Sequence, residues 1–376
     1  MRWLLAPDSY KGSLSAAEVA QAMRRGLLRA DPAAECVLKP MADGGEGTLD
    51  ALHAASGGEW LSLPSLDAVG RAQEVACLRL PNGMVVVEVA RIVGLPQAGE
   101  TAVLQRHSGG VGSVLRQLRE SGVRRIAVAL GGSSTNDGGA GCLAALGAEW
   151  RDATGGVLDG SPAQMAACVT LLAEGLREAW RDVELEIWSD VDNPLTGSRG
   201  ATAVFGAQKG VSADVAQALD AGIEAWAGEL DALHGEAVRL RPGSGAAGGL
   251  GYALQWLGGC MRSGAEAVAE HTGLAAALTQ ADWALSGEGR SDSQTLSGKA
   301  PACVAALAAT AGVPVSLISG AVEADAEGRL AQRFQGMFSL CNRPMTLAMA
   351  LDEAAERVAE CAEQLARAIL AARRGG

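Results

Sequence analysis

Apolar and polar residues follow the same order in the first and last thirds of the chain: a short apolar run, a polar loop, then a helical stretch. An apolar run at residues 3–6 predicts a strand, and a helix follows at 16–30, where Ser15 and Glu18 have the spacing of a capping box. The order returns after residue 264, with strands predicted at 283–285, 315–318 and 338–340. This alternation predicts a mostly parallel sheet with helices on both faces.

The middle of the chain has a different pattern. Apolar runs at 75–80 and 84–89 flank Asn82-Gly83, which predicts a β-hairpin. Strands are also predicted at 126–130 and 185–188. A chain of 376 residues is too long for one ordinary core. We therefore expect an α/β protein of two α/β domains: a discontinuous Rossmann-like domain with a parallel sheet, residues 1–62 and 282–376, and a second, mixed α/β domain, residues 63–281, inserted into it.

Composition excludes several classes of protein. Hydrophobic residues make up 48% of the chain, which excludes a disordered protein, and a net charge of −12 without a basic cluster argues against a nucleic-acid partner. No apolar stretch approaches the roughly 18 residues of a membrane span, so we expect no membrane partner. The eight cysteines form no CxxC pair and fit a reducing compartment, so the expected location is cytoplasmic.

The polar loops that follow the predicted strands carry the candidate chemistry. Five of them combine an acid with small or hydroxylic residues: 8–11, 43–48, 133–139, 190–193 and 288–295. Ligands of open α/β sheets bind beyond the carboxyl ends of the strands, where these loops lie. Phosphoryl transfer needs hydroxyls and backbone N–H groups around phosphate, carboxylates for Mg²⁺ and a cation for developing charge. The loops supply all three, although any one of them alone would be an ordinary polar turn.

Familiar motifs narrow the alternatives. No P-loop sequence occurs, and a G-x-G-x-x-G match at Gly243, Gly245 and Gly248 lacks the flanking strands of a dinucleotide site, so glycines for close packing or a phosphate turn fit it better. An apolar strand followed by Asp190 and Asp192 resembles the start of aspartyl-phosphate phosphohydrolases. That alternative stays open, as does a non-catalytic sensor of sugar acids.

Several longer stretches resemble the bacterial type I glycerate kinase family. The first is Ala6-Pro7-Asp8-Ser9-Tyr10-Lys11-Gly12-Ser13, and the second is Met41-Ala42-Asp43-Gly44-Gly45-Glu46-Gly47-Thr48. The others are at 131–141, 190–195, 203–210, 243–251, 286–290 and 294–301, and together they cover nearly the whole chain in order. The chain departs from the family pattern at 107–114, where a hydroxyl pair and an acid are replaced, and at 91–93, where Arg-Ile-Val stands in place of small residues.

The resemblance implies ATP- and Mg²⁺-dependent phosphorylation of D-glycerate to 2-phosphoglycerate or 3-phosphoglycerate, in a cleft between two α/β domains. Its small-molecule substrate would be glycerate, and the sequence leaves a homodimer open. With the loop chemistry, it leads to the following assignments. The expected catalytic residues are Asp190, as the favoured base, Lys11, Arg290 and Glu288. The expected substrate-binding residues are Asp8, Ser9, Asp43, Gly44, Glu46 and Asp292. The expected ATP-binding residues are Gly131, Gly132, Ser133, Ser134, Thr135, Asp137, Gly245 and Gly248, and the expected Mg²⁺ ligands are Asp43, Asp190 and Asp192.

Overall fold

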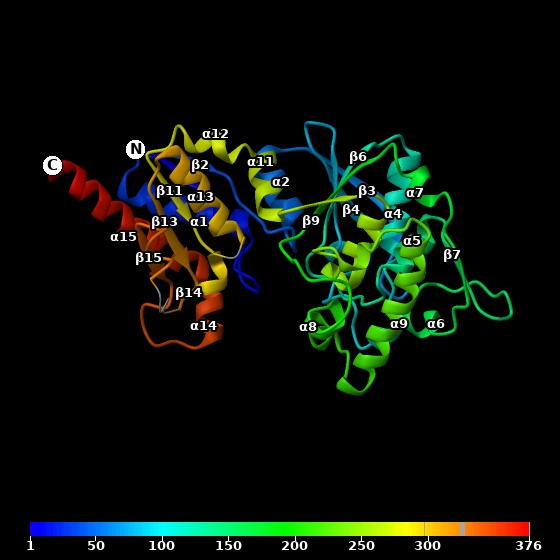
Figure 1. Cartoon of the computed structure of the whole chain (residues 1–376). Coiled ribbons are helices and arrows are strands. Elements are labelled where there is room, and N and C mark those ends of the chain that lie inside the picture. Colours follow the sequence, from blue (N-terminus) through cyan, green and yellow to red (C-terminus); the bar gives the residue numbers. More distant parts are fainter. Residues whose placement is uncertain (297, 324–327, 376) are drawn as a thin grey trace. The chain divides into compact units, whose positions relative to one another are not determined.

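The computed structural model describes residues 1–296, 298–323 and 328–375, which form two compact α/β units (Figure 1). The first unit is discontinuous and comprises Met1–Asp43, Gly47–Gly57 and Ser263–Gly376. The second comprises Gly44–Glu46 and Gly58–Arg262. The expected fold class, a parallel-sheet unit with a mixed α/β unit inserted into it, is confirmed.

The first unit is built from strands and helices of both ends of the chain. In chain order these are β1 (Arg2–Leu5), α1 (Ala16–Ala30), β2 (Glu35–Leu38), α2 (Thr48–Ser56), α11 (Gly264–Thr272), α12 (Leu274–Leu278), β11 (Trp283–Ser286), β12 (Arg290–Ser291), η5 (Ser293–Leu296), α13 (Ala300–Ala311), β13 (Val315–Ser319), β14 (Ala321–Val322), β15 (Gly336–Ser339), α14 (Leu347–Asp352) and α15 (Ala354–Gly375).

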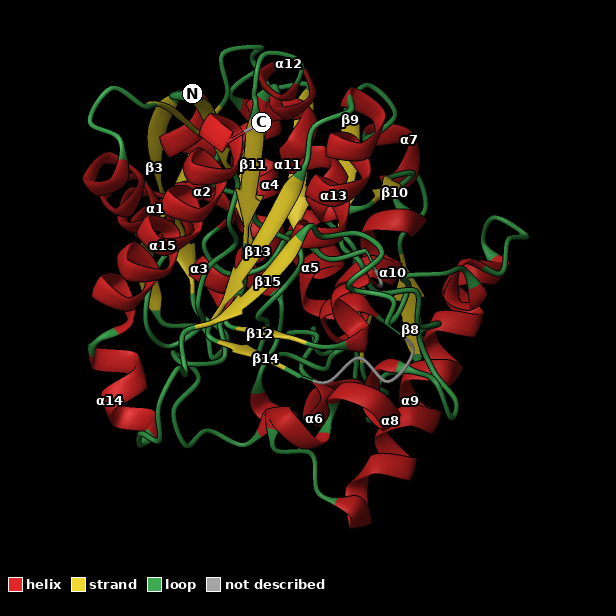
Figure 2. Ribbon diagram, turned by 90° about the vertical axis from the view of Figure 1, so that its left-hand side faces the viewer, coloured by secondary structure: helices red, strands yellow, loops and turns green. Residues whose placement is uncertain are grey.

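Its main sheet has five strands in the order β15-β13-β11-β1-β2, all parallel. Figure 2 shows β11, β13 and β15 side by side, and the short parallel pair β12–β14 extends the loops after β11 and β13. This is the doubly wound order in which chain connections run to opposite sides of a central pair of strands. Here the central pair is β1 and β11, with Trp3 opposite Trp283.

Local sequence explains the helices that cover this sheet. The predicted capping box is present: Ser15 and Glu18 satisfy each other's backbone N–H groups at the start of α1. Apolar residues spaced three or four apart, such as Val19, Met23 and Leu27, are buried against α15 and the sheet. Gly26 allows α1 and α15 to approach closely, since a Cβ there would lie 2.0 Å from the Ala359 carbonyl oxygen.

The second unit contains the middle of the chain. Its elements are β3 (Glu59–Leu66), β4 (Ala72–Arg79), β5 (Val85–Glu88), α3 (Ala90–Val93), η1 (Val103–Gln105), α4 (Gly109–Glu120), β6 (Arg125–Ala129), α5 (Ala140–Leu146), β7 (Glu149–Arg151), α6 (Pro162–Met165), β8 (Thr170–Leu172), α7 (Leu176–Ala179), β9 (Glu184–Trp188), α8 (Ala201–Phe205), η2 (Ala207–Lys209), α9 (Ala213–Ala232), η3 (Val238–Leu240), η4 (Ala246–Gly249), α10 (Leu250–Trp256) and β10 (Cys260–Arg262).

Its six-stranded sheet is mixed, in the order β10-β9-β6-β5-β4-β3. β10, β9, β6 and β5 are parallel to one another, whereas β4 is antiparallel to both of its neighbours, β5 and β3. The predicted hairpin is the β4–β5 pair, and Gly83 in its turn has a φ of 85°, which glycine adopts without strain.

The units divide the chain close to the expected domain boundaries but not at them. The first change falls at Gly57/Gly58 rather than at 62/63, because β3 pairs with β4 from Glu59 onward. The later change falls at Arg262/Ser263 rather than at 281/282, because α11 packs against α2 and α12 against α13. Among the described residues, no helix is both long and apolar enough to span a membrane.

Candidate active site

The loops after β1 and β11 meet at the switch point of the five-stranded sheet. The backbone ladder continues past the strand ends, where the N–H of Ala6 donates to Leu285 (2.8 Å) and the N–H of Asp8 donates to Gly287 (2.8 Å). Ser286 adds a side-chain hydrogen bond of 2.9 Å to the Ala6 carbonyl. The two loops are thereby held side by side at the position where open α/β sheets bind ligands.

A cavity of about 410 Å³ opens beside these loops, within the first unit. Its polar side is formed by six of the predicted site residues: Asp8, Ser9, Lys11, Asp43, Glu288 and Arg290. Lys299 lies in the same lining, and the remainder is largely apolar and comes mostly from the C-terminal part of the chain, with Tyr10 and Ser13 from the loop after β1. Residues predicted as separate polar loops are therefore gathered around one cavity.

Asp8 has the most perturbed carboxyl of this cavity. Burial and repulsion by Asp43 raise its pKa from 3.8 to about 7, and Glu288 adds to the rise. The backbone N–H of Ser9 donates to Asp8 Oδ1 (2.6 Å), and this bond and the nearby Lys11 act in the opposite direction. A carboxyl with a pKa near neutrality can take up and release a proton at physiological pH.

Glu288 is buried and its carboxylate is fixed by neighbouring side chains. Oε1 accepts hydrogen bonds from Thr295 Oγ1 (2.6 Å) and Ser291 Oγ (3.1 Å). Oε2 lies 3.6 Å from Lys299 Nζ, at the start of α13. These contacts fix the Glu288 carboxylate, and the ion pair keeps the Lys299 ammonium group beside it in the cavity lining.

The remaining cations lie nearer the surface. Lys11 is exposed and lines the cavity, and Arg290 forms an ion pair with Glu323 while more than half of its side chain is accessible. With Lys299, the cavity thus has three cationic groups that can contact an anionic ligand.

Gly287 shows why small residues stand in these loops. A Cβ at this position would lie 1.8 Å from the Ile318 carbonyl oxygen and 2.8 Å from the Tyr10 hydroxyl. That hydroxyl donates a 2.6 Å hydrogen bond to the same carbonyl. Gly287 after β11 and Tyr10 after β1 are therefore packed closely against the end of β13.

The predicted phosphate loop, 131–137, lies in the second unit, after β6. Its hydroxyl side chains turn inward: Ser134 Oγ donates to the Val93 carbonyl (2.8 Å), and Thr135 is fully buried. Lys209, also buried, donates to the Thr135 carbonyl (2.7 Å) and to Ser133 Oγ (3.0 Å). Burial lowers the pKa of Lys209 from 10.5 to about 7.

Asp137 is saturated by protein donors. Its Oδ2 accepts from the N–H and the hydroxyl of Ser108 (both 2.7 Å) and from the N–H of Gly141 (3.2 Å), while Oδ1 accepts from the N–H of Gly139 (3.1 Å). Ser108 belongs to the segment, 107–114, where the sequence departs from the family pattern. These bonds give Asp137 an evident structural role, and Gly131 and Gly132, its neighbours in the loop, pack against Gly45 and Ala90.

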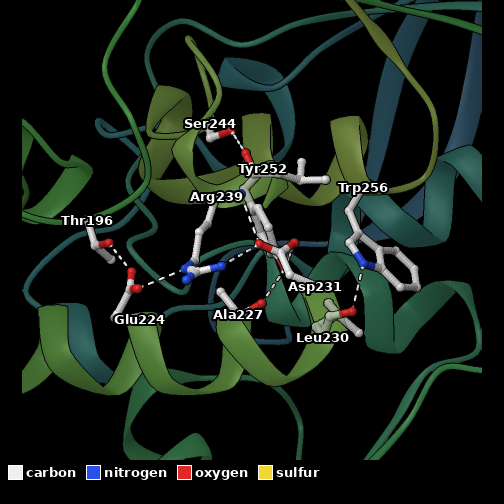
Figure 3. A network of polar contacts seen from close by, with 10 residues as sticks. Thr196, Glu224, Ala227, Leu230, Asp231, Arg239, Ser244, Tyr252 and Trp256 are labelled. Carbon is white, nitrogen blue, oxygen red and sulfur yellow. Dashed lines mark hydrogen bonds and ion pairs between the residues drawn. The ribbon is translucent and has the colours of Figure 1, made fainter. Parts of the chain in front are cut away.

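Gly245 and Gly248 are packed against backbone. A Cβ would lie 2.3 Å from the Pro194 carbonyl oxygen at Gly245 and 2.0 Å from the Thr135 carbonyl oxygen at Gly248. Nearby, Arg239 bridges Glu224 (2.8 Å) and Asp231 (3.0 Å) of α9 (Figure 3). The segment that contains both glycines is thus tied to its surroundings by close packing, and their assignment to ATP stays a prediction.

The other predicted residues are dispersed. Asp190 and Asp192 follow β9 in the second unit and are exposed, and Asp192 pairs with Arg199 (3.2 Å). Gly44 and Glu46 also group with the second unit, where the Gly44 carbonyl accepts from the N–H of Gly131 (2.9 Å). Asp292 follows β12, and its backbone N–H donates to Thr295 Oγ1 (3.0 Å).

No group of three or more His, Cys, Asp or Glu side chains among the described residues is arranged to hold a metal ion. Mg²⁺ in nucleotide-using enzymes is usually bound by only one or two carboxylates together with substrate phosphates. The carboxylate of Asp43, which faces the cavity beside Asp8, fits that mode of binding.

Sequence reasoning assigned no site role to the apolar side of the cavity. Leu347, Ala350 and Leu351 of α14 line it, at the i, i+3, i+4 spacing of one helix face, together with Ala354 at the start of α15. Thr346 caps this helix by accepting from the N–H of Met349 (3.3 Å). The apolar spacing and the capping threonine are both present in the sequence, so this helix and its apolar face could have been predicted.

Fold and cavity together define the class: an α/β enzyme with carboxylates and cations gathered at the switch point of a doubly wound sheet. Residues 3–370 match the model of the glycerate kinase family. The chain is 36% identical to a glycerate kinase of Bacillus subtilis (strain 168), over 99% of this chain and 97% of that protein. It is 38% identical to the glycerate 2-kinase of Escherichia coli (strain K12), over 86% of each.

A solved structure agrees with these relatives. The crystal structure of a Salmonella typhimurium LT2 protein assigned as glycerate kinase 2 superposes with a TM-score of 0.85 at 36% identity, covering 100% of this chain and 99% of that one. The chain belongs to the glycerate kinase family. The expected family and the expected enzyme class, a kinase, are confirmed.

Proposed function

We propose that this enzyme transfers the γ-phosphoryl group of ATP to D-glycerate, giving 2-phosphoglycerate, in the cavity of the first unit. The observation that carries the proposal is the meeting of Asp8, Asp43, Glu288 and Lys299 around this cavity at the switch point of the sheet. The identity to the Escherichia coli relative, which is named a glycerate 2-kinase, supports the choice of product.

Asp8 is proposed as the general base. In the reaction, the hydroxyl oxygen of glycerate forms a bond to the γ-phosphorus, the bond to the bridging oxygen of ADP breaks, and the hydroxyl proton passes to a carboxylate. Asp8 stands at the end of β1, on the cavity, and its pKa of about 7 suits proton transfer near neutral pH. This replaces Asp190 as the favoured base, because Asp190 is exposed in the second unit.

Asp43 is proposed to hold Mg²⁺ together with the phosphates of ATP. The ion would supply charge neutralisation for the γ-phosphoryl oxygens. Lys11 and Lys299 would contact phosphoryl oxygens, and Arg290 would bind the carboxylate of glycerate, for which a planar guanidinium is well matched. Glu288 would hold Lys299 in position through the 3.6 Å ion pair.

The test is ADP formation from ATP, Mg²⁺ and D-glycerate, with the product passed to enolase. Enolase turnover identifies 2-phosphoglycerate, and its absence with ADP formed identifies the 3-isomer. If ADP appears with neither D- nor L-glycerate, while phosphate is released from simple esters without ATP, the kinase proposal fails and phosphohydrolysis replaces it.

The choice of base is tested by Asp8→Asn and Asp190→Asn measured in parallel, with Asp182→Asn as the matched control. We expect kcat to fall by roughly 10²–10⁴-fold for Asp8→Asn, the usual effect of removing a general base. Asp182 is exposed, pairs with Arg124 (2.8 Å) and belongs to no predicted site, so its variant should stay near wild type. A 10²-fold loss in Asp190→Asn, with Asp8→Asn active, would return the role to Asp190.

A further inference from the structure

The cavity of the first unit has an apolar wall that glycerate does not need. Leu340 and Cys341, after β15, and Leu347, Ala350, Leu351 and Ala354, on α14 and the start of α15, all line it. Leu347 is 75% exposed and Leu351 39% exposed, so both leucines keep apolar surface accessible on the side of the cavity opposite its charged groups. Below, "apolar wall" means these six residues.

The apolar wall is held in place by polar contacts outside the cavity. Ser13, in the loop after β1, donates to the Leu351 carbonyl (2.9 Å) and so ties α14 to the loop that carries Asp8. At the junction of α14 and α15, Glu353 pairs with both Arg357 and Arg343, at 3.3 Å for the latter. Arg357 also donates to Asn342 Oδ1 (2.9 Å), which fixes the segment after β15.

Size and chemistry together indicate the occupant. A volume of about 410 Å³ falls in the range of roughly 300–1,000 Å³ that proteins use for drug-sized ligands, far beyond the needs of a three-carbon acid. Glycerate is polar at every carbon and gains little from leucine side chains. Of the two substrates of a kinase, only the nucleotide joins an anionic phosphate chain to a flat, largely apolar ring.

We propose that the apolar wall is the binding surface for the purine base of ATP, with the phosphates directed to the charged side of the same cavity. The proposal rests on the proposed kinase function and places the nucleotide in the first unit. It assigns no nucleotide contact to the loop at 131–137 or to Gly245 and Gly248, whose environments are explained by packing within the second unit.

The experiment compares the wild type with Leu347→Ser/Leu351→Ser and Ala350→Phe, which respectively remove and fill the proposed surface. Met349→Ser is the matched control, since Met349 is a 41% exposed residue of the same helix that does not line the cavity. We measure KM for ATP and for glycerate, and the Kd of ADP and of pyrophosphate by calorimetry. Pyrophosphate retains the anionic group but lacks the base.

The expected result is a rise of about tenfold or more in KM for ATP and in Kd for ADP, as for other losses of apolar contact in ligand pockets. KM for glycerate and Kd for pyrophosphate should change less than about threefold, and Met349→Ser should match wild type. A rise in KM for glycerate alone would assign the wall to the acid substrate and overturn the proposal. An equal rise in Kd for ADP and for pyrophosphate would show that the apolar wall has only a structural role, and would also overturn the proposal.

The kinase function and the apolar-wall proposal fail in different ways. A wild-type enzyme that forms no ADP with glycerate contradicts the function. An active enzyme in which both wall variants bind ADP as the wild type does contradicts only the proposal that the apolar wall binds the purine base.

Discussion

Replacing Asp8 by asparagine should make the protein more stable and less active at the same time. The wild-type carboxyl has a pKa raised from 3.8 to about 7 by burial and by Asp43. The folded protein therefore holds this proton more tightly than the unfolded chain does. Protonation stabilises the fold fully below about pH 4, and this contribution is lost as the pH rises through 7.

The magnitude follows from the size of the shift. Three pKa units at about 1.4 kcal/mol each give an upper limit of roughly 4 kcal/mol above pH 8. Because Asp8 is partly exposed to solvent, screening reduces this value, and we expect about 1–3 kcal/mol. Asparagine is neutral at every pH and can still accept the hydrogen bond from the N–H of Ser9, so the variant avoids the cost of the buried charge.

The assay is hydrogen exchange of the β1 and β11 amides, with wild type and Asp8→Asn compared at the same pH. The variant should exchange more slowly by roughly 5–150-fold at pH 8.5, which corresponds to 1–3 kcal/mol. At pH 5, where the unfolded carboxyl is already ionised, about a third of the difference should remain, and below about pH 4 it should vanish. Faster exchange in the variant at pH 8.5, or a gain equal at both values, would refute the reasoning about the Asp8 carboxyl.

Three further predictions concern packing, a buried lysine and a positioned carboxylate. Gly287→Ala should lower the free energy of unfolding by several kcal/mol, because its Cβ would clash with the Ile318 carbonyl oxygen. Gly228→Ala, at an open position of a helix, is the control and should leave the free energy of unfolding unchanged or raise it in the same denaturation experiment. Between pH 7 and 10 the Lys209 amine is neutral in the folded protein and protonated in the unfolded chain, so the free energy of unfolding of the wild type should rise by up to about 4 kcal/mol over this range. Urea unfolding should show this rise for the wild type and not for Lys209→Met. Glu288→Gln should lower kcat by about tenfold or more with a small change in stability, and a variant with wild-type kinetics would show that this carboxylate has no part in the reaction.

The fold was predictable because its signals are local. The apolar runs that became β1, β11, β13 and β15 are short and bounded by polar loops, and the cap of α1 uses residues three apart. The unit boundaries were harder to predict. Whether α11 packs with α2 depends on surfaces separated by more than half of the chain, and no local composition change records that contact.

The site was predictable in its residue types and only partly in its grouping. Asp8, Asp43 and Glu288 were predicted for the candidate site because each follows a strand, and in the structure all three line one cavity. Ser134 follows a strand in the same way, yet its hydroxyl turns inward to Val93. Loop sequence alone does not determine whether a hydroxyl faces a ligand or a buried carbonyl, because the partner comes from a distant segment.

The pairing of β1 with β11 has a consequence for synthesis on the ribosome. Trp3 lies opposite Trp283, so the central strand pair of the first unit cannot form until most of the chain has been translated. At roughly 5–20 residues per second, the edge of β1 that pairs with β11 waits ten seconds or more for that strand, whereas its β2 partner is available early. The second unit, nearly continuous from Gly58 to Arg262, can complete its sheet during that interval. A nascent chain that ends after Arg262 would therefore carry a finished second unit and a β1–β2 pair whose other edge stays unpaired until β11 is made.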